Sequence, residues 1–141
     1  MISDELKKIV ERLNNQGKNR FSHGATAEQI AAFEKQNKVT FPTKFREWLL
    51  FSDGGECFLP AGVQLYGVSH KPLIDVNDND RPDDSYIVIG ALASGDPILC
   101  ERKGERISIY NREADRIESD ETYPDFFSFL GDLFNLLGIG E

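Results

Sequence analysis

The chain has 141 residues, a length that fits one domain with a single core, and its 40% hydrophobic content excludes a disordered chain. Residues 1–50 carry nine Lys or Arg and six Asp or Glu, a balance of +3, whereas residues 51–141 carry seven and eighteen, a balance of −11. Such acidity excludes a nucleic-acid-binding surface and favours basic protein partners. Because the sequence has no apolar run of about 18 residues and no signal-peptide pattern, we expect no membrane span and a cytoplasmic location.

Two amphipathic helices are predicted at the start of the chain. Residues 2–14 repeat apolar side chains on one helical face, with Lys and Glu on the other. A second helix is expected to begin at Thr26, where the spacing to Gln29 is that of a capping box, and to end near Asn37.

A third helix is predicted directly after Pro42, since proline is favoured at the start of a helix. Phe45 and Trp48 share its apolar face, and we interpret them as core residues rather than as aromatics that stack on a ligand. Gly54 and Gly55 follow. No P-loop Lys-Ser/Thr comes after them, so we interpret them as a helix C-cap with positive φ rather than as a phosphate cradle.

After Gly55, short apolar runs alternate with turn residues. We expect strands at residues 57–59, 63–68, 86–92, 97–101 and 106–110, with hairpin turns at 94–96 and 103–105. A last helix is predicted from Pro124 to Leu137, with Thr122 and Asp125 as its cap partners. This order predicts an α+β fold: an antiparallel sheet of about five to six strands, with N-terminal helices and one C-terminal helix packed on one face.

Neither catalysis nor metal binding finds support in the sequence. Cys57 and Cys100 stand in apolar runs and are interpreted as buried thiols. His23 and His70 have no evident Ser, Cys or carboxylate partners, so neither a zinc site nor a catalytic residue is expected. Residues 75–86 begin like a calcium loop, but the glycine and glutamate positions are taken by other residues, and no metal or cofactor is expected.

Four features in order resemble the SUKH superfamily, which includes the fungal Smi/Knr cell-wall regulators. They are the capped helix at 25–34, the Phe41-Pro42 helix ending in Asp-Gly-Gly, the strand-turn-strand run at 89–98, and the aromatic-rich last helix. The resemblance covers about residues 20–137, with residues 1–19 as an additional N-terminal helix of one domain spanning 1–141. The motif residues are Phe41, Pro42, Phe45, Trp48, Leu49, Gly54, Gly55, Gly90 and Gly95.

The resemblance implies a non-catalytic interaction module. Bacterial members of the superfamily resemble immunity proteins that neutralise nuclease- or deaminase-type toxins by direct binding, and this is the function we expect. The alternative is a regulatory scaffold related to cell-wall glucan synthesis, and an unrecognised enzyme is the third possibility. The oligomeric state stays open.

Two acidic tracts, which we expect to be loops, are the candidate partner-binding sites. Residues 75–84 form one tract and residues 113–125 the other. Together they could mimic a phosphate backbone and cover the basic active site of a toxin. The alternative is an ordinary solvated surface. The candidate residues are Asp78, Asp80, Asp83, Asp84, Glu118, Asp120 and Glu121.

Overall fold

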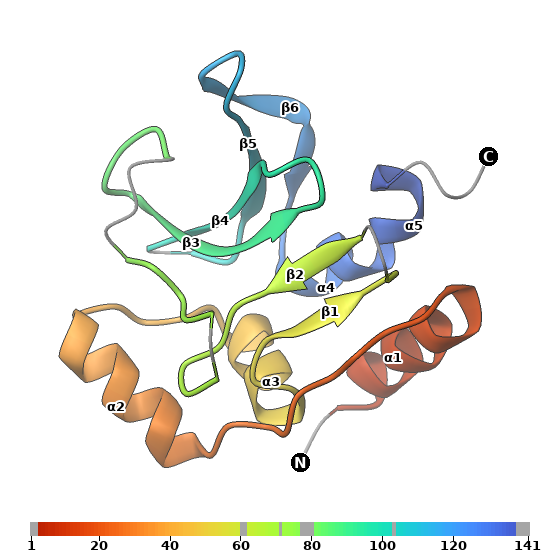
Figure 1. Ribbon diagram of the computed structural model, residues 1–141. Coiled ribbons are helices and arrows are strands. Elements are labelled where there is room, and N and C mark those ends of the chain that lie inside the picture. The colour runs from red at the N-terminus through yellow and green to blue at the C-terminus, as the bar shows by residue number, and fades with distance from the viewer. Residues whose placement is uncertain (1–2, 60–61, 71, 77–80, 103, 138–141) are drawn as a thin grey trace.

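The computed structural model describes residues 3–59, 62–70, 72–76, 81–102 and 104–137 (Figure 1). Its first helices are α1 (Asp4–Gln16), α2 (Ala27–Asn37) and α3 (Thr43–Phe51). Helix α1 begins after Ser3, whose side chain accepts the N–H of Leu6. The capping box predicted between Thr26 and Gln29 is confirmed at the start of α2.

The strands form one six-stranded antiparallel sheet in the order β1-β2-β3-β4-β5-β6, so the predicted meander and the α+β class are confirmed. Short hairpin connections favour this order because each strand can pair with the next one along the chain. The strands are β1 (Gly55–Cys57), β2 (Val63–Leu65), β3 (Tyr86–Leu92), β4 (Pro97–Glu101), β5 (Ile107–Asn111) and β6 (Arg116–Tyr123).

The prediction that residues 113–125 form a loop is wrong. Residues 116–123 form β6, which pairs with β5. Thr122, expected to cap the last helix, lies within this strand opposite Ser108. Acidic residues have low β propensity, so pairing with β5 rather than local preference makes this segment a strand.

The C-terminal segment is two short helices, α4 (Phe126–Gly131) and α5 (Leu133–Leu136), rather than the single helix expected over 124–137. Asp125 caps α4 as predicted and accepts the N–H of Ser128. The break falls at Asp132, whose carboxylate accepts the hydroxyl of Tyr123 at 2.9 Å. This bond to β6 holds Asp132 in a non-helical conformation between the two helices.

Helix α3 ends earlier than the glycine pair. Its C-cap is Ser52, in an extended conformation, so the prediction that Gly54 and Gly55 form the cap is wrong. Both glycines do have positive φ, 89° and 120°, and they turn the chain from α3 into β1. At the other end of α3, Pro42 provides no side-chain cap, and the Glu105 carboxylate accepts the Thr43 N–H instead.

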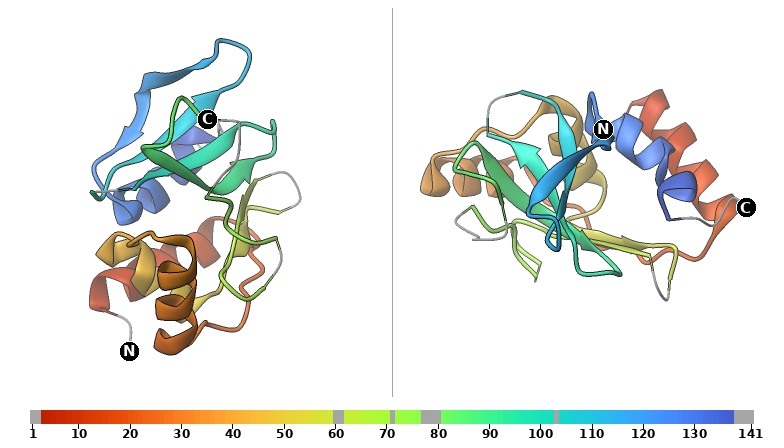
Figure 2. Two further views of the ribbon diagram at one scale, coloured as in Figure 1. Left: turned by 90° about the vertical axis from the view of Figure 1, so that its left-hand side faces the viewer. Right: turned by 90° about the horizontal axis from the view of Figure 1, so that it is seen from above.

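The main core lies between the helices and one face of the sheet. Phe45 and Trp48 of α3 are fully buried, and both rings contact Phe126 of α4, with centroids 4.9 and 5.9 Å apart. Every helix that the structure describes contributes side chains to this core. In Figure 2 (left), α1 to α3 gather in the lower half of the molecule and β3 to β6 rise above them.

Candidate protein-binding surface

The sheet face turned away from the helices, here called the outer face, carries its own small cluster of buried side chains. Val88 of β3, Leu99 of β4 and Tyr110 of β5 form it. Val88 pairs with Leu99 across the two strands. Because successive side chains of a strand point to opposite faces, Ile87, Ile98 and Cys100 point to the main core. Within the described residues, only strand and loop side chains contribute to the outer cluster.

Tyrosines cover the outer cluster. Tyr66, Tyr86 and Tyr110 all pack there, three of the four tyrosines in the chain. Val88 is 2% exposed and Leu99 is fully buried, although no described helix lies over them. Tyr66 and Tyr86 remain half-buried, so part of each ring faces solvent. Rigid aromatic side chains with a polar tip are enriched in protein interfaces, and this face presents two of them together.

Carboxylates stand beside these tyrosines. Asp75 is exposed and forms a β-bridge with Val88, which places it on the outer face. Glu101 stands directly opposite Tyr86 across the β3–β4 pair. Asp83 and Asp84 are exposed in the loop before β3, and with Glu101 they line an open cavity of about 660 Å³. Arg106, directly before β5, is an exposed cation near this end of the sheet.

Two arginines hold the loop that carries Asp83 and Asp84. Arg81 donates through Nη1 to the carbonyls of Val76 and Tyr86, at 2.7 and 2.8 Å. Arg102 donates through Nε to the Asp84 carbonyl at 2.8 Å and through Nη2 to the Val76 carbonyl at 3.1 Å. Both guanidinium groups therefore donate mainly to the backbone, and Arg81 Nη2 also donates to the Asp84 carboxylate at 3.0 Å. The side chains of Asp83 and Asp84 nevertheless remain exposed.

Asp83 also folds its own turn. Its carboxylate accepts the backbone N–H of Ser85 at 2.7 Å. This backbone hydrogen bond is the main reason that the pKa of Asp83 lies below its ordinary value, so the side chain is anionic at neutral pH. The charge of this loop is therefore present throughout the range in which a protein partner would bind.

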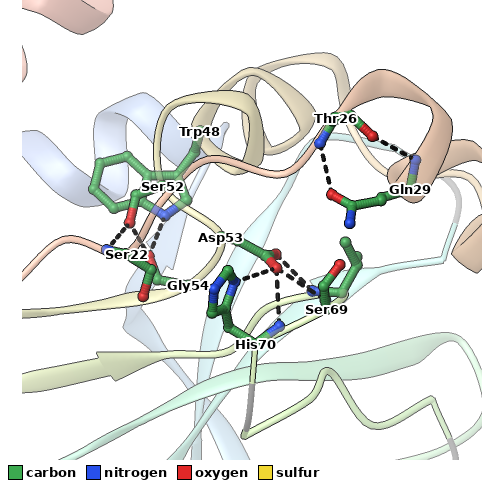
Figure 3. A network of polar contacts seen from close by, with 10 residues as sticks. Ser22, Thr26, Gln29, Trp48, Ser52, Asp53, Gly54, Ser69 and His70 are labelled. Carbon is green, nitrogen blue, oxygen red and sulfur yellow. Dashed lines mark hydrogen bonds and ion pairs between the residues drawn. The ribbon is translucent and has the colours of Figure 1, made fainter.

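A buried carboxylate ties the Asp-Gly-Gly segment to the loop that follows β2 (Figure 3). The Asp53 side chain is fully buried and accepts the backbone N–H groups of Val68, Ser69 and His70 at 2.7, 2.9 and 3.0 Å. His70 Nδ1 lies 3.0 Å from the same carboxylate. These bonds fix residues 68–70, which follow Tyr66 of the outer face.

A family model described as the SMI1 / KNR4 family (SUKH-1) matches residues 24–132. The chain belongs to the SUKH-1 family. The match runs from the residues before α2 through all six strands to the break after α4, and it leaves α1 outside. No curated protein matches the chain.

The residues that carried the resemblance to this family lie mainly in the core and at turns of the SUKH-1 chain. The side chains of Phe41, Pro42, Phe45, Trp48 and Leu49 are buried. Gly95 has a φ of 94° in the β3–β4 turn. These positions build the scaffold and leave the outer face to other residues.

Gly90 of this motif sits at a β-bulge. Paired positions advance from Val88 to Gly90 on β3 while their partners advance only from Leu99 to Ile98 on β4. A Cβ at Gly90 would lie 2.4 Å from the Gln64 carbonyl oxygen, so no larger residue fits without a backbone shift.

The seven acidic candidates fall into three groups in the SUKH-1 structure. Asp83 and Asp84 lie on the loop beside the outer face, whereas Asp78 and Asp80 fall outside the described residues. Glu118, Asp120 and Glu121 belong to β6, on the far side of β4 and β5. Three strand spacings separate β3 from β6, about 14 Å along the sheet.

The acidic part of β6 is a large bulge. From Ser108 to Tyr110 the pairing advances two residues on β5, while on β6 it runs five residues, from Thr122 to Ile117. The bulge explains why Ile117 packs on the outer cluster while Tyr123, six residues on, packs in the main core. Bulges and charges on a terminal strand also oppose edge-to-edge aggregation, which is a structural reason for this acidity.

The prediction that His70 has no carboxylate partner is wrong, because the Asp53 carboxylate lies 3.0 Å from its Nδ1. No sequence signal pointed to the contact, because Asp53 and His70 are 17 residues apart and meet only through the fold. An Asp–His pair orients an imidazole, but hydrolysis also needs a nucleophile beside the other ring nitrogen. Among the described residues, Asp53 supplies the only recorded side-chain hydrogen bond to His70.

The described residues form neither a metal-binding cluster nor a membrane-spanning helix. No group of three or more His, Cys, Asp or Glu side chains there could hold a metal ion. Likewise, none of the helices built from those residues has the length and apolar character needed to cross a membrane.

Proposed function

We propose that this SUKH-1 chain is a non-catalytic immunity protein that binds and neutralises a nuclease- or deaminase-type toxin in the cytoplasm. The family fits immunity or regulatory roles. The observation that carries the toxin-binding proposal is the set of outward carboxylates at one end of the outer face, Asp75, Asp83, Asp84 and Glu101. Nuclease active sites bind phosphates with basic residues, so an acidic protein surface is complementary to them.

The net charge supports the same partner class. At −8, the chain repels nucleic acid and attracts a basic protein over long range. Occlusion of the active site would then combine steric exclusion of substrate with charge pairing. Strand β6 belongs to the same sheet, three strand spacings from β3, a separation within the span of an ordinary protein interface.

The proposal predicts that the gene for this chain lies next to one for a large secreted protein with a C-terminal nuclease or deaminase domain, and that domain is the probe. Co-expression should restore growth to cells that produce the domain, and the purified proteins should bind. Raising the salt from about 0.05 to about 0.5 M should slow association at least tenfold, because electrostatic steering is screened.

A regulatory scaffold would give a different result. In that case no such domain would bind, and the protein recovered from native cells would belong to cell-wall synthesis. A complex whose association rate does not change with salt would contradict the electrostatic part of the proposal.

A further inference from the structure

The outer face has the composition of a docking surface. Its centre is Val88, Leu99 and Tyr110, and Tyr66 and Tyr86 present half-exposed rings above it. Protein interfaces concentrate binding energy in buried aromatic anchors surrounded by polar residues. The described helices all lie on the opposite face, and both rings are partly exposed.

Charge specifies the occupant. Asp75 and Glu101 lie on the same face as the rings, and Asp83 and Asp84 lie at its end. Among the described residues, Arg102 lines the same cavity as Asp83, Asp84 and Glu101 but donates to backbone carbonyls. Arg81 also donates to backbone carbonyls and its side chain is only 10% exposed, and Arg106 is an exposed cation near the same end of the sheet. Arg81 also pairs with Asp84, but that carboxylate remains 96% exposed. A positively charged protein surface complements this arrangement, whereas nucleic acid or a second copy of this acidic chain would be repelled.

We infer that the partner is a protein with a basic surface and that it docks on the outer face, with Tyr66 and Tyr86 as the anchoring residues. The inference rests on the proposed function and assigns its binding surface. An Arg or Lys of the partner over the Tyr86 ring would lie beside Glu101, so that ring and carboxylate recognise one cation together. The helical side of the molecule stays outside the complex.

Two double variants with the same charge change separate this surface from the rest of the molecule. Asp84→Lys with Glu101→Lys alters the outer face, and Glu11→Lys with Glu28→Lys alters exposed positions on α1 and α2. Both add four positive units, so any effect of net charge is common to them. Thermal unfolding of each variant checks that it is folded before binding is measured.

The probe is a catalytically inactive variant of the C-terminal toxin domain. The outer-face double variant should weaken binding to it about 100-fold, and the helix double variant less than about fivefold. Tyr86→Ala should weaken binding more than tenfold, and Tyr86→Phe, which keeps the ring, much less. The molar mass of the free chain in solution tests whether a second copy occupies this face instead. A dimer formed through this face would overturn the inference.

The outcomes distinguish the two proposals. Equal effects of both double variants, or a larger effect of the helix pair, would overturn the assignment of the surface while the binding function stands. If the wild-type chain fails to bind the domain, the proposed function is wrong, and the inference falls with it.

Discussion

At the scale of single residues, carboxylates that look alike in the sequence serve different purposes. Glu34 accepts the Phe41 N–H at 2.7 Å and pairs with Arg46 at 2.6 Å, so it secures the turn between α2 and α3. Glu105 accepts the first N–H of α3. Asp83 and Asp84, in contrast, keep their side chains exposed. Of these carboxylates, only the exposed Asp83 and Asp84 are available to a partner.

Asp53 is the carboxylate whose loss should cost the most stability. Asp53→Ala would leave three backbone N–H groups of the 68–70 loop without their acceptor, and we expect unfolding free energy to fall by about 3 kcal/mol. His70→Ala, at a half-exposed side chain, should cost less than about 1 kcal/mol. Urea denaturation measures both. Equal losses would show that the backbone bonds are not the source of the stability.

The two thiols should be chemically silent in the folded protein. Burial raises the pKa of Cys57 to about 12 and also raises that of Cys100. Because only the thiolate reacts, neither residue should be modified by a thiol reagent at pH 8, and both should react once urea unfolds the chain. Fast modification of either thiol without unfolding would contradict their burial.

At the scale of elements, the sequence predicted the helices and strands whose local capping and propensity signals agree with the tertiary structure. The Thr26–Gln29 capping box and the runs at 86–92 and 97–101 carry such signals and were found at the expected bounds. Strand β6 was missed because its acidic residues oppose strand formation locally, and only pairing with β5 overrides them. The contact of Asp53 with the 68–70 loop was missed because local signals carry no information about distant contacts.

The β3 bulge gives a test at a single glycine. Gly90→Ala would place a Cβ 2.4 Å from the Gln64 carbonyl oxygen, and the backbone shift should lower the unfolding free energy by about 2–4 kcal/mol. Gly131→Ala is the control, since a Cβ there meets nothing within 4 Å and a helical alanine is favoured. Thermal unfolding should show opposite signs for the two variants. A stable Gly90→Ala protein would contradict the bulge geometry.

The start of α4 should make stability depend on pH. Burial would raise the pKa of Asp125, but the hydrogen bonds from Ser128 and Lys44 outweigh it and hold that pKa below its ordinary value. A lowered folded pKa stabilises the protein above the unfolded pKa of about 3.9, and this stabilisation is lost as pH falls through the folded value. Asp125→Asn keeps a capping side chain and removes the charge.

Asp125→Asn should therefore be less stable than the wild type by about 0.5–1 kcal/mol at pH 7, and the gap should close below about pH 4. Urea denaturation of both proteins at pH 7 and at pH 3 measures this difference in stability. A gap of the same size at pH 3 would show that the charge of Asp125 does not contribute.

At the scale of the whole molecule, the described helices bury one face of the sheet and leave the tyrosine-bearing outer face uncovered by helices. The sequence predicted the α+β class and the SUKH family, both of which are confirmed, whereas the acidic partner-binding surface stays a prediction. It could not predict which sheet face is open, because Tyr66, Tyr86 and Tyr110 come from three separate segments and gather only in the folded sheet. The family motif builds the scaffold, and the outer face presents the candidate binding residues.

The central claim, neutralisation by direct binding without catalysis, is tested most directly by stoichiometry. A fixed amount of the toxin domain is titrated with this chain, and residual toxin activity is measured until it no longer changes. The account predicts a linear fall to zero at a fixed, stoichiometric ratio, with toxin activity recovered intact when the complex is dissociated. Inactivation of excess toxin by a small amount of the chain, or a chemically altered toxin after dissociation, would contradict it.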